Sequence, residues 1–151
     1  MNNLQKAEKC RRECRYIESI KYFKRALKKE ASVEIMMGLA DVYRMIGKFK
    51  NAASLYDKCR KISKMIGDEQ LYADSLTGFG MAKRGLGKYN EAYRYLNLAN
   101  LLYAEFKDEE GEAFCKWCLA GLHRIKGDLK ESQLYFIKAL SLYISQRYHA
   151  V

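Results

Sequence analysis

The segment RMIGKF at residues 44–49 recurs as RGLGKY at 84–89 and again as RIKGDL at 124–129. In each copy an arginine stands three residues before a glycine, and an apolar residue stands two residues after it. Glycines 47, 87 and 127 are therefore forty residues apart. A fixed period of this length marks stacked units, each of which covers the apolar face of its neighbour. The sequence predicts a helical scaffold with a groove.

Apolar residues recur at three- and four-residue steps on both sides of each glycine, as in an amphipathic helix. Glycine suits the left-handed residue that ends a helix, so each of these glycines is expected to end the first helix of a hairpin. The chain contains no proline that could interrupt a helix from within. We expect helices at 2–13, 16–29, 32–46, 49–65, 69–86, 89–106, 109–126 and 129–147.

The pattern around Gly47 resembles the tetratricopeptide repeat, which has a small residue early in its first helix and an alanine and an aromatic residue in its second. The matching residues are Leu39, Ala40, Tyr43, Gly47, Phe49, Ala52, Tyr56 and Cys59. Similar sets surround Gly87 and Gly127, and a weaker one lies near the N-terminus. The period of forty residues is longer than the family's usual 34, so the extra residues are expected to lengthen both helices of the later units.

The resemblance implies an all-α, right-handed α-solenoid of four hairpins, or about eight antiparallel helices. One domain would cover residues 1–151, with repeats at about 1–31, 32–67, 68–107 and 108–148. Such repeats imply a scaffold or adaptor that binds a segment of another protein in its concave groove.

Positive charge is concentrated in the first half of the chain. Residues 1–66 contain 17 Lys and Arg against 7 Asp and Glu, whereas residues 67–151 contain 11 of each. The excess of ten charges is either a set of solvated helix faces or a patch that attracts an acidic protein segment, a nucleic acid or anionic lipid. We therefore expect an acidic peptide partner, with binding of nucleic acid or another polyanion through the basic half as the alternative.

The chain has five cysteines, an odd number that does not suggest a disulfide framework. Cys115 and Cys118 form a lone C-x-x-C, which we interpret as structural because it falls inside a predicted helix. No apolar run is long enough to span a bilayer, and the N-terminus lacks the apolar block of a secretory signal. We expect a cytoplasmic protein without a membrane span.

Residues for catalysis are scarce. The chain has two histidines, and His123 falls on an apolar helix face where a packed histidine is the expected role. No acid, base, nucleophile or metal-ligand set converges, and no glycine-rich loop suggests a phosphate site. The sequence predicts that the protein is not an enzyme and needs no cofactor or metal.

The resemblance also assigns the groove, because the family lines it with fixed positions of the first helix of each repeat. These candidates are Arg11, Glu34, Met37, Asp41, Arg44, Asp74, Thr77, Met81, Arg84, Phe114, Trp117 and Arg124. Arginine occupies the same position in all four repeats. This row of guanidinium groups suits the carboxylates of a bound segment, or it stabilises the C-terminal ends of the helices.

The last predicted helix is apolar on more than one side, although solenoids usually end in a helix with a polar outer face. The candidate surface residues are Leu134, Ile137, Tyr143 and Ile144. Three explanations remain open: self-association, a docking partner, or further repeats in a longer protein.

Overall fold

The computed structural model describes residues 1–149, and this part of the chain contains eight α-helices and no strand. The predicted all-α solenoid fold is confirmed, and every helix ends within two residues of its predicted bounds. Residues 150 and 151, which belong to the predicted domain, lie outside the described part. The helices are α1 (Asn3–Arg12), α2 (Tyr16–Lys29), α3 (Val33–Met45), α4 (Phe49–Ile66), α5 (Glu69–Gly85), α6 (Tyr89–Glu105), α7 (Glu109–Lys126) and α8 (Leu129–His149).

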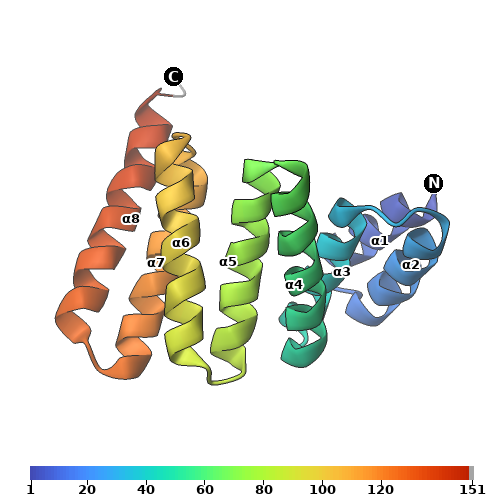
Figure 1. Ribbon diagram of the computed structural model, residues 1–151, viewed down its shortest axis with the longest axis horizontal. Helices are drawn as coiled ribbons and strands as arrows, with labels where there is room; N and C mark the ends of the chain where they lie inside the picture. Colours follow the sequence, from blue (N-terminus) through green and yellow to red (C-terminus); the bar gives the residue numbers. More distant parts are fainter. Residues whose placement is uncertain (150–151) are drawn as a thin grey trace.

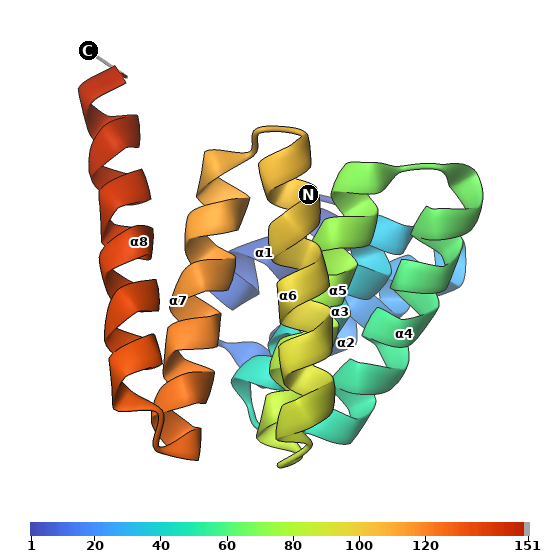
Figure 2. The same cartoon turned by 60° about the vertical axis from the view of Figure 1, so that its left-hand side comes forward.

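Four hairpins follow one another along the long axis of the molecule, from α1 and α2 at one end to α8 at the other (Figure 1). Helices α1, α3, α5 and α7 contact one another in that order. Within the described residues, no such contact joins α2 to α4, α4 to α6 or α6 to α8. The odd-numbered helices therefore form the inner layer of a curved stack. In the turned view, α8 lies at the end of this stack, alongside α7 (Figure 2).

The repeated glycines end the inner helices as predicted. Gly47, Gly87 and Gly127 have positive φ angles of 78°, 74° and 86°. After the first of them, the N–H of Lys48 donates to the carbonyl of Tyr43 at 2.8 Å, and the equivalent bonds in the other two turns are 2.9 Å long. These bonds satisfy carbonyls that the end of a helix leaves unpaired. The recurrent glycine thus fixes the turn inside each of the last three hairpins.

Aspartates start the long inner helices. The side chain of Asp68 accepts a hydrogen bond from the N–H of Leu71 at 2.9 Å, and that of Asp108 accepts one from the N–H of Gly111 at 3.0 Å. Both are N-caps, which satisfy a backbone N–H that the start of a helix leaves unpaired. The turn before Asp68 contains Gly67, whose φ is 75°.

The later helices are longer, as the forty-residue period predicts. Among the inner helices, α3 has 13 residues, whereas α5 has 17 and α7 has 18. Among the outer helices, α2 has 14 residues, whereas α4 has 18 and α6 has 17. Each gain is about one helical turn.

An aromatic ring from each of the first two outer helices packs beneath a glycine of the next inner helix. Phe23 lies beneath Gly38, where an added Cβ would be 2.5 Å from the ring atom Cε1. The buried Tyr56 lies beneath Gly78, where an added Cβ would overlap the ring. The missing side chain lets each inner helix approach the preceding hairpin closely.

At the corresponding place in the next junction, a different pair of side chains replaces the ring and the glycine. Leu96 occupies the position forty residues after Tyr56, and Cys118 occupies the position forty residues after Gly78. Both are fully buried in one apolar cluster. A smaller side chain on the outer helix is thus matched by a larger one on the inner helix, as close packing requires.

The ring-and-glycine contact predicts the effect of Gly78→Ala. Alanine inside a helix normally stabilises a protein by about 1 kcal/mol relative to glycine. Here we expect a loss of about 1–3 kcal/mol instead, because the new methyl group must displace the buried ring of Tyr56. Urea unfolding followed by circular dichroism measures this difference.

Gly121→Ala is the matched control, since it also lies inside an inner helix, and the nearest atom to its added Cβ is Arg84 Nη1 at 3.4 Å. We expect it to be neutral or stabilising. Equal effects of the two substitutions would contradict the packing explanation.

Candidate peptide-binding groove

A hollow of about 330 Å³ lies on the inner helices α3, α5 and α7. It brings together seven of the residues predicted for the groove, from three repeats. They are Met37, Asp41, Arg44, Asp74, Thr77, Met81 and Phe114. Gly78 and Tyr103 complete its lining. We call this the central hollow.

A second hollow of about 280 Å³ lies towards the C-terminal ends of α5 and α7. It contains three further predicted residues, Arg84, Trp117 and Arg124. Gly121, Ile125 and, from α8, Phe136 line the rest. We call this the arginine hollow.

An exposed aromatic pair connects the two hollows. The rings of Phe114 and Trp117 are stacked, with their centroids 6.4 Å apart. The side chains are 37% and 50% exposed, so neither is needed to fill the core. Large exposed aromatic surface in a groove is characteristic of binding sites.

Asp41 neutralises the first part of the predicted arginine row. Its carboxylate lies 3.3 Å from Arg11 Nη1 and accepts a hydrogen bond from the hydroxyl of Tyr56. Arg44 Nε donates to the same hydroxyl at 3.2 Å. Arg11 also pairs with Glu8 at 2.7 Å. These two arginines therefore hold the inner wall together.

A second tyrosine–aspartate pair lies in the third repeat. The hydroxyl of Tyr103 donates to Asp74 Oδ1, and Gln70 Nε2 donates to the same oxygen at 3.3 Å. Burial raises the pKa of Asp74 above the ordinary carboxyl value, although both hydrogen bonds work in the opposite direction. Burial also raises the pKa of Tyr103, so its hydroxyl remains a donor at neutral pH.

Sequence reasoning placed Tyr56 on an apolar stripe and did not include Tyr103 in the groove. Both rings are buried, yet both hydroxyls contact aspartates that line the groove. The residue type could have indicated this role in the sequence, because a buried tyrosine usually has a hydrogen-bond partner for its hydroxyl, whereas a phenylalanine needs none.

The predicted surface of α8 is divided between two sides of the helix. Tyr143 lies on the groove side, where it lines a hollow of about 340 Å³ with Asp74, Asp108, Glu110 and Phe114. The side chains of Leu134, Ile137 and Ile144 are exposed. They follow one another at intervals of three and seven residues, which places them on a single stripe.

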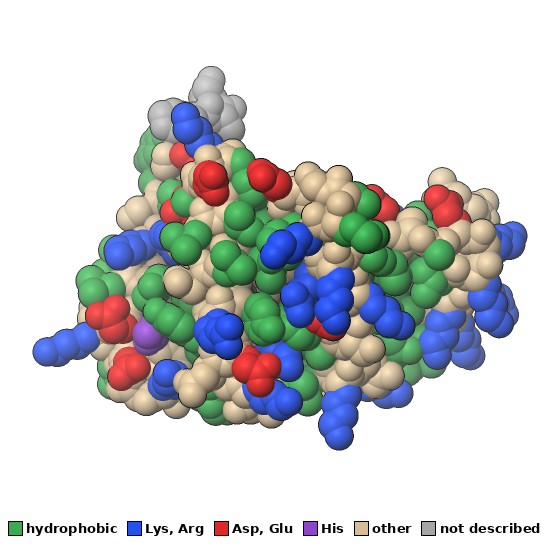
Figure 3. All heavy atoms as spheres, in the orientation of Figure 1, with side chains coloured by type: hydrophobic (Ala, Val, Ile, Leu, Met, Phe, Trp, Pro, Cys, Tyr) green, Lys and Arg blue, Asp and Glu red, His purple; other side chains and the backbone are tan. Residues whose placement is uncertain are grey.

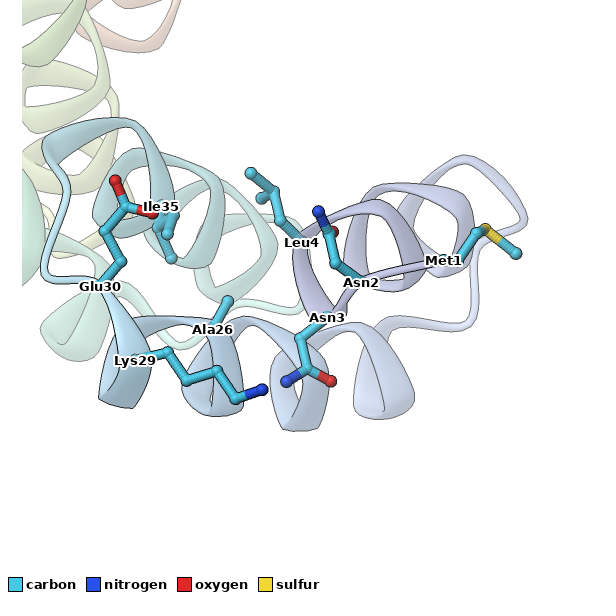
Figure 4. A pocket seen from close by; sticks show the side chains of 8 residues that line it. All are labelled: Met1, Asn2, Asn3, Leu4, Ala26, Lys29, Glu30 and Ile35. Carbon is cyan, nitrogen blue, oxygen red and sulfur yellow. The ribbon is translucent and has the colours of Figure 1, made fainter.

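Two further features lie outside the central and arginine hollows, the predicted residue Glu34 and a separate hollow near the N-terminus. Glu34 is exposed in the first turn of α3. A separate hollow of about 300 Å³ opens among the start of α1, the end of α2 and the start of α3 (Figure 4). It is lined by Met1, Asn2, Asn3, Leu4, Ala26, Lys29, Glu30 and Ile35, none of which lines the central or arginine hollow.

The excess positive charge lies mainly on the outer helices α2 and α4, and basic side chains gather over α4 on the face shown in Figure 3. The exposed residues are Lys21, Lys24, Arg25, Lys28, Lys29, Lys50, Lys58, Lys61 and Lys64. Arg60 is less exposed, because its guanidinium lies over the rings of Phe79 and Tyr95 at 5.2 and 5.5 Å. Most of the basic surface is thus separate from the groove.

His123 is packed between two rings, as its apolar position predicts. Its ring is stacked on Tyr135 with centroids 5.3 Å apart, and the edge contact with Tyr93 is 5.7 Å. Its Nδ1 lies 3.5 Å from Asp128 Oδ2. The side chain of His149 lies outside the described part.

Four of the five cysteines are buried, and Cys14 is exposed. Burial raises the pKa of the Cys115 thiol to about 12 and that of the Cys118 thiol to about 11. Both thiols are therefore protonated at neutral pH and poor nucleophiles. Among the described residues, no group of three or more metal-binding side chains is placed to hold an ion.

Residues 31–99 match the family model described as tetratricopeptide repeat. This match and the stacked hairpins confirm the predicted resemblance to the tetratricopeptide repeat. No curated protein matches the sequence. No helix in the described residues is both long and apolar enough to cross a membrane.

Several solved structures share the fold. A Rap protein complexed with Competence and Sporulation Factor has a TM-score of 0.88 and 14% identity, over 96% of this chain and 43% of that one. Aspartyl phosphate phosphatase F from Bacillus subtilis has a TM-score of 0.82 and 17% identity, over 99% and 40%. The TPR domain of Arabidopsis FLU has a TM-score of 0.70 and 13% identity, over 75% and 95%.

The chain thus spans about two fifths of the first two of these proteins. At identities of 13–17%, the likeness to these structures shows the fold alone.

The burial of the thiols predicts their reactivity. Ellman's reagent should modify one thiol per native chain, Cys14, and all five after denaturation. The reason is that the other four are shielded from the reagent, and Cys115 and Cys118 are also fully protonated. Absorbance at 412 nm counts the modified groups. Cys14→Ser should abolish the native reaction, whereas rapid modification of that variant would show that one of the four buried thiols is reactive.

Proposed function

We propose that this protein is an adaptor that binds a segment of another protein in the groove formed by α3, α5 and α7, and that the segment is acidic. The observation that carries the proposal is the exposed pair of Phe114 and Trp117 between two hollows of one continuous inner wall. Apolar side chains of a bound segment would cover these rings, and polar groups on either side would fix its position.

Two structures of the same fold support this type of ligand. One is a Rap protein complexed with Competence and Sporulation Factor, and the other is a Rap conjugation gene regulator of plasmid pLS20 in complex with the Phr* peptide. Their identities of 14% and 18% transfer the fold and not the ligand. The second of them nevertheless shows that a protein of this fold is able to form a complex with a peptide.

We infer a binding role rather than a catalytic one, since the groove presents arginines, aromatic rings and hydrogen-bonded aspartates. A reducing compartment such as the cytoplasm suits five unpaired thiols, four of them buried.

A second candidate function is binding of nucleic acid or another polyanion. It is favoured by the exposed lysines on α2 and α4, which gather over the face shown in Figure 3. Such binding would use the outer surface and would weaken steeply as salt is added, because it depends on the release of counterions. The two functions therefore differ in both the surface used and the salt dependence.

The groove proposal is tested by selecting peptides from a displayed random library on the wild-type protein. The double variant Phe114→Ala with Trp117→Ala should bind the selected peptides at least about tenfold more weakly, because it removes the exposed aromatic anchors. Isothermal titration calorimetry measures the affinities.

Leu134→Ala with Ile137→Ala is the matched control, since it removes exposed apolar side chains from α8 instead. The control should bind like the wild type. Equal losses in both variants, or no selected peptide at all, would contradict the proposed function. If peptide binding disappears in the variant Lys58→Gln with Lys61→Gln, and also when salt is added, the polyanion alternative would be favoured.

We also propose that the exposed stripe of α8 joins two copies of the chain. Leu134, Ile137 and Ile144 are each close to half exposed on a helix that packs along α7. Pairing of two such stripes would remove this apolar surface from water.

Ile137→Glu should convert a dimer to a monomer, because it places a charge in the middle of the stripe. Sedimentation velocity over a range of protein concentrations measures the change. Lys138→Glu, one residue along and also exposed, is the control for the added negative charge. A wild-type protein that stays monomeric at high concentration would contradict self-association.

A further inference from the structure

We propose that the groove has one anion-binding subsite, formed by Arg84 and Arg124, and that it takes the side-chain carboxylate of an aspartate or glutamate within the bound segment. An apolar side chain next to that carboxylate would pack on Trp117. This inference rests on the proposed peptide-binding function and assigns its acidic specificity to one place.

The four arginines of the predicted row are not equivalent in the structure. Arg11 lies 3.3 Å from Asp41, and Arg44 lies 3.9 Å from the same carboxylate and 3.2 Å from the hydroxyl of Tyr56. Both arginines are thus already paired with an acidic side chain of the protein itself. A ligand carboxylate would have to compete with Asp41 for them.

The later repeats lack the acid that neutralises the first two arginines. The positions forty and eighty residues after Asp41 are Met81 and Gly121. Among the ion pairs of the described residues, which extend to 4.0 Å, none includes Arg84 or Arg124. The row therefore contains a neutralised half in the first two repeats and an open half in the last two.

The open half has the shape of a site. Arg84 and Arg124 line the same hollow of about 280 Å³. Gly121 has no side chain to fill it, and the guanidinium of Arg84 lies so close to this glycine that an added Cβ would be 3.4 Å from its Nη1. Two forked donors at one small hollow match the geometry of a carboxylate.

The ends of α5 and α7 do not cancel this attraction. Both arginines lie in the last turn of their helices, where the helix dipole is equivalent to about half a negative charge. Two full positive charges outweigh two such ends. The dipoles instead help to keep the arginines in place.

The apolar part of the hollow indicates what accompanies the carboxylate. Trp117, Ile125 and Phe136 form the remaining wall, and the ring of Trp117 continues through Phe114 into the central hollow. A segment can therefore pass along the groove rather than end in it. For this reason we assign the subsite to an acidic side chain within the segment and not to a terminal carboxylate.

Trp117 provides a direct probe, because it is the chain's single tryptophan and it lines the subsite. The ligands are the peptides recovered by the display selection, synthesised with acetylated N-termini and amidated C-termini. Each is paired with versions in which one acidic residue is replaced by its amide, and binding is followed by Trp117 fluorescence at physiological salt.

We expect one acidic residue per peptide whose replacement by the amide lowers affinity roughly tenfold, the typical cost of losing a charged hydrogen bond. Arg84→Gln with Arg124→Gln should lower affinity by a similar factor and abolish the difference between the acid and amide peptides. Arg12→Gln with Arg94→Gln removes the same charge from exposed positions and should retain that difference. Circular dichroism checks that both variants remain folded.

Several results would overturn the subsite. One such result is equal affinity of the selected peptides for the wild type and for Arg84→Gln with Arg124→Gln. Another is unchanged affinity after every replacement of an acid by its amide. Both results would leave the groove function intact. Binding that requires a free C-terminus would assign the hollow to a terminal carboxylate. If oligodeoxythymidine displaces the peptides from the wild type but no longer binds to Arg84→Gln with Arg124→Gln, the arginine hollow would be a phosphate site instead. Failure to select any peptide would instead remove the proposed function itself.

Discussion

The close approach of each inner helix to the preceding outer helix is the contact on which the rest of this structure depends. Gly38 covers the ring of Phe23, and Gly78 covers the ring of Tyr56. Because no side chain separates the ring from the helix, consecutive hairpins stack with their inner helices in contact. This arrangement places polar positions from different repeats on one continuous wall.

Tyr56 connects this packing to the chemistry of the groove. Its ring fills the junction beneath Gly78, and its hydroxyl contacts both Asp41 and Arg44. One buried residue therefore helps to stack the repeats and to fix two polar side chains on the inner wall. Leu96, its equivalent in the next repeat, has no hydroxyl, so Arg84 has no corresponding partner there. The difference between the two halves of the groove begins with this change.

Much of the fold could be predicted because its determinants are local. A glycine with positive φ ends a helix, an aspartate starts one, and a forty-residue period lengthens the helices between them. The roles of Tyr56, Tyr103 and Tyr143 could not be predicted in the same way. Each role depends on how one hairpin is rotated against the next. The periodicity of apolar residues within a helix does not determine that rotation angle.

The sequence alone determined a stack of two-helix units with an arginine at the same place in each unit, since helix periodicity and turn chemistry act over a few residues. Only the tertiary structure decided which of those arginines are already paired. Asp41 reaches Arg11 across thirty positions of sequence, and the hydroxyl of Tyr56 reaches Asp41 from another helix. Such contacts arise when separate helices are brought side by side, so arginines at equivalent positions of the repeats have different partners in the groove.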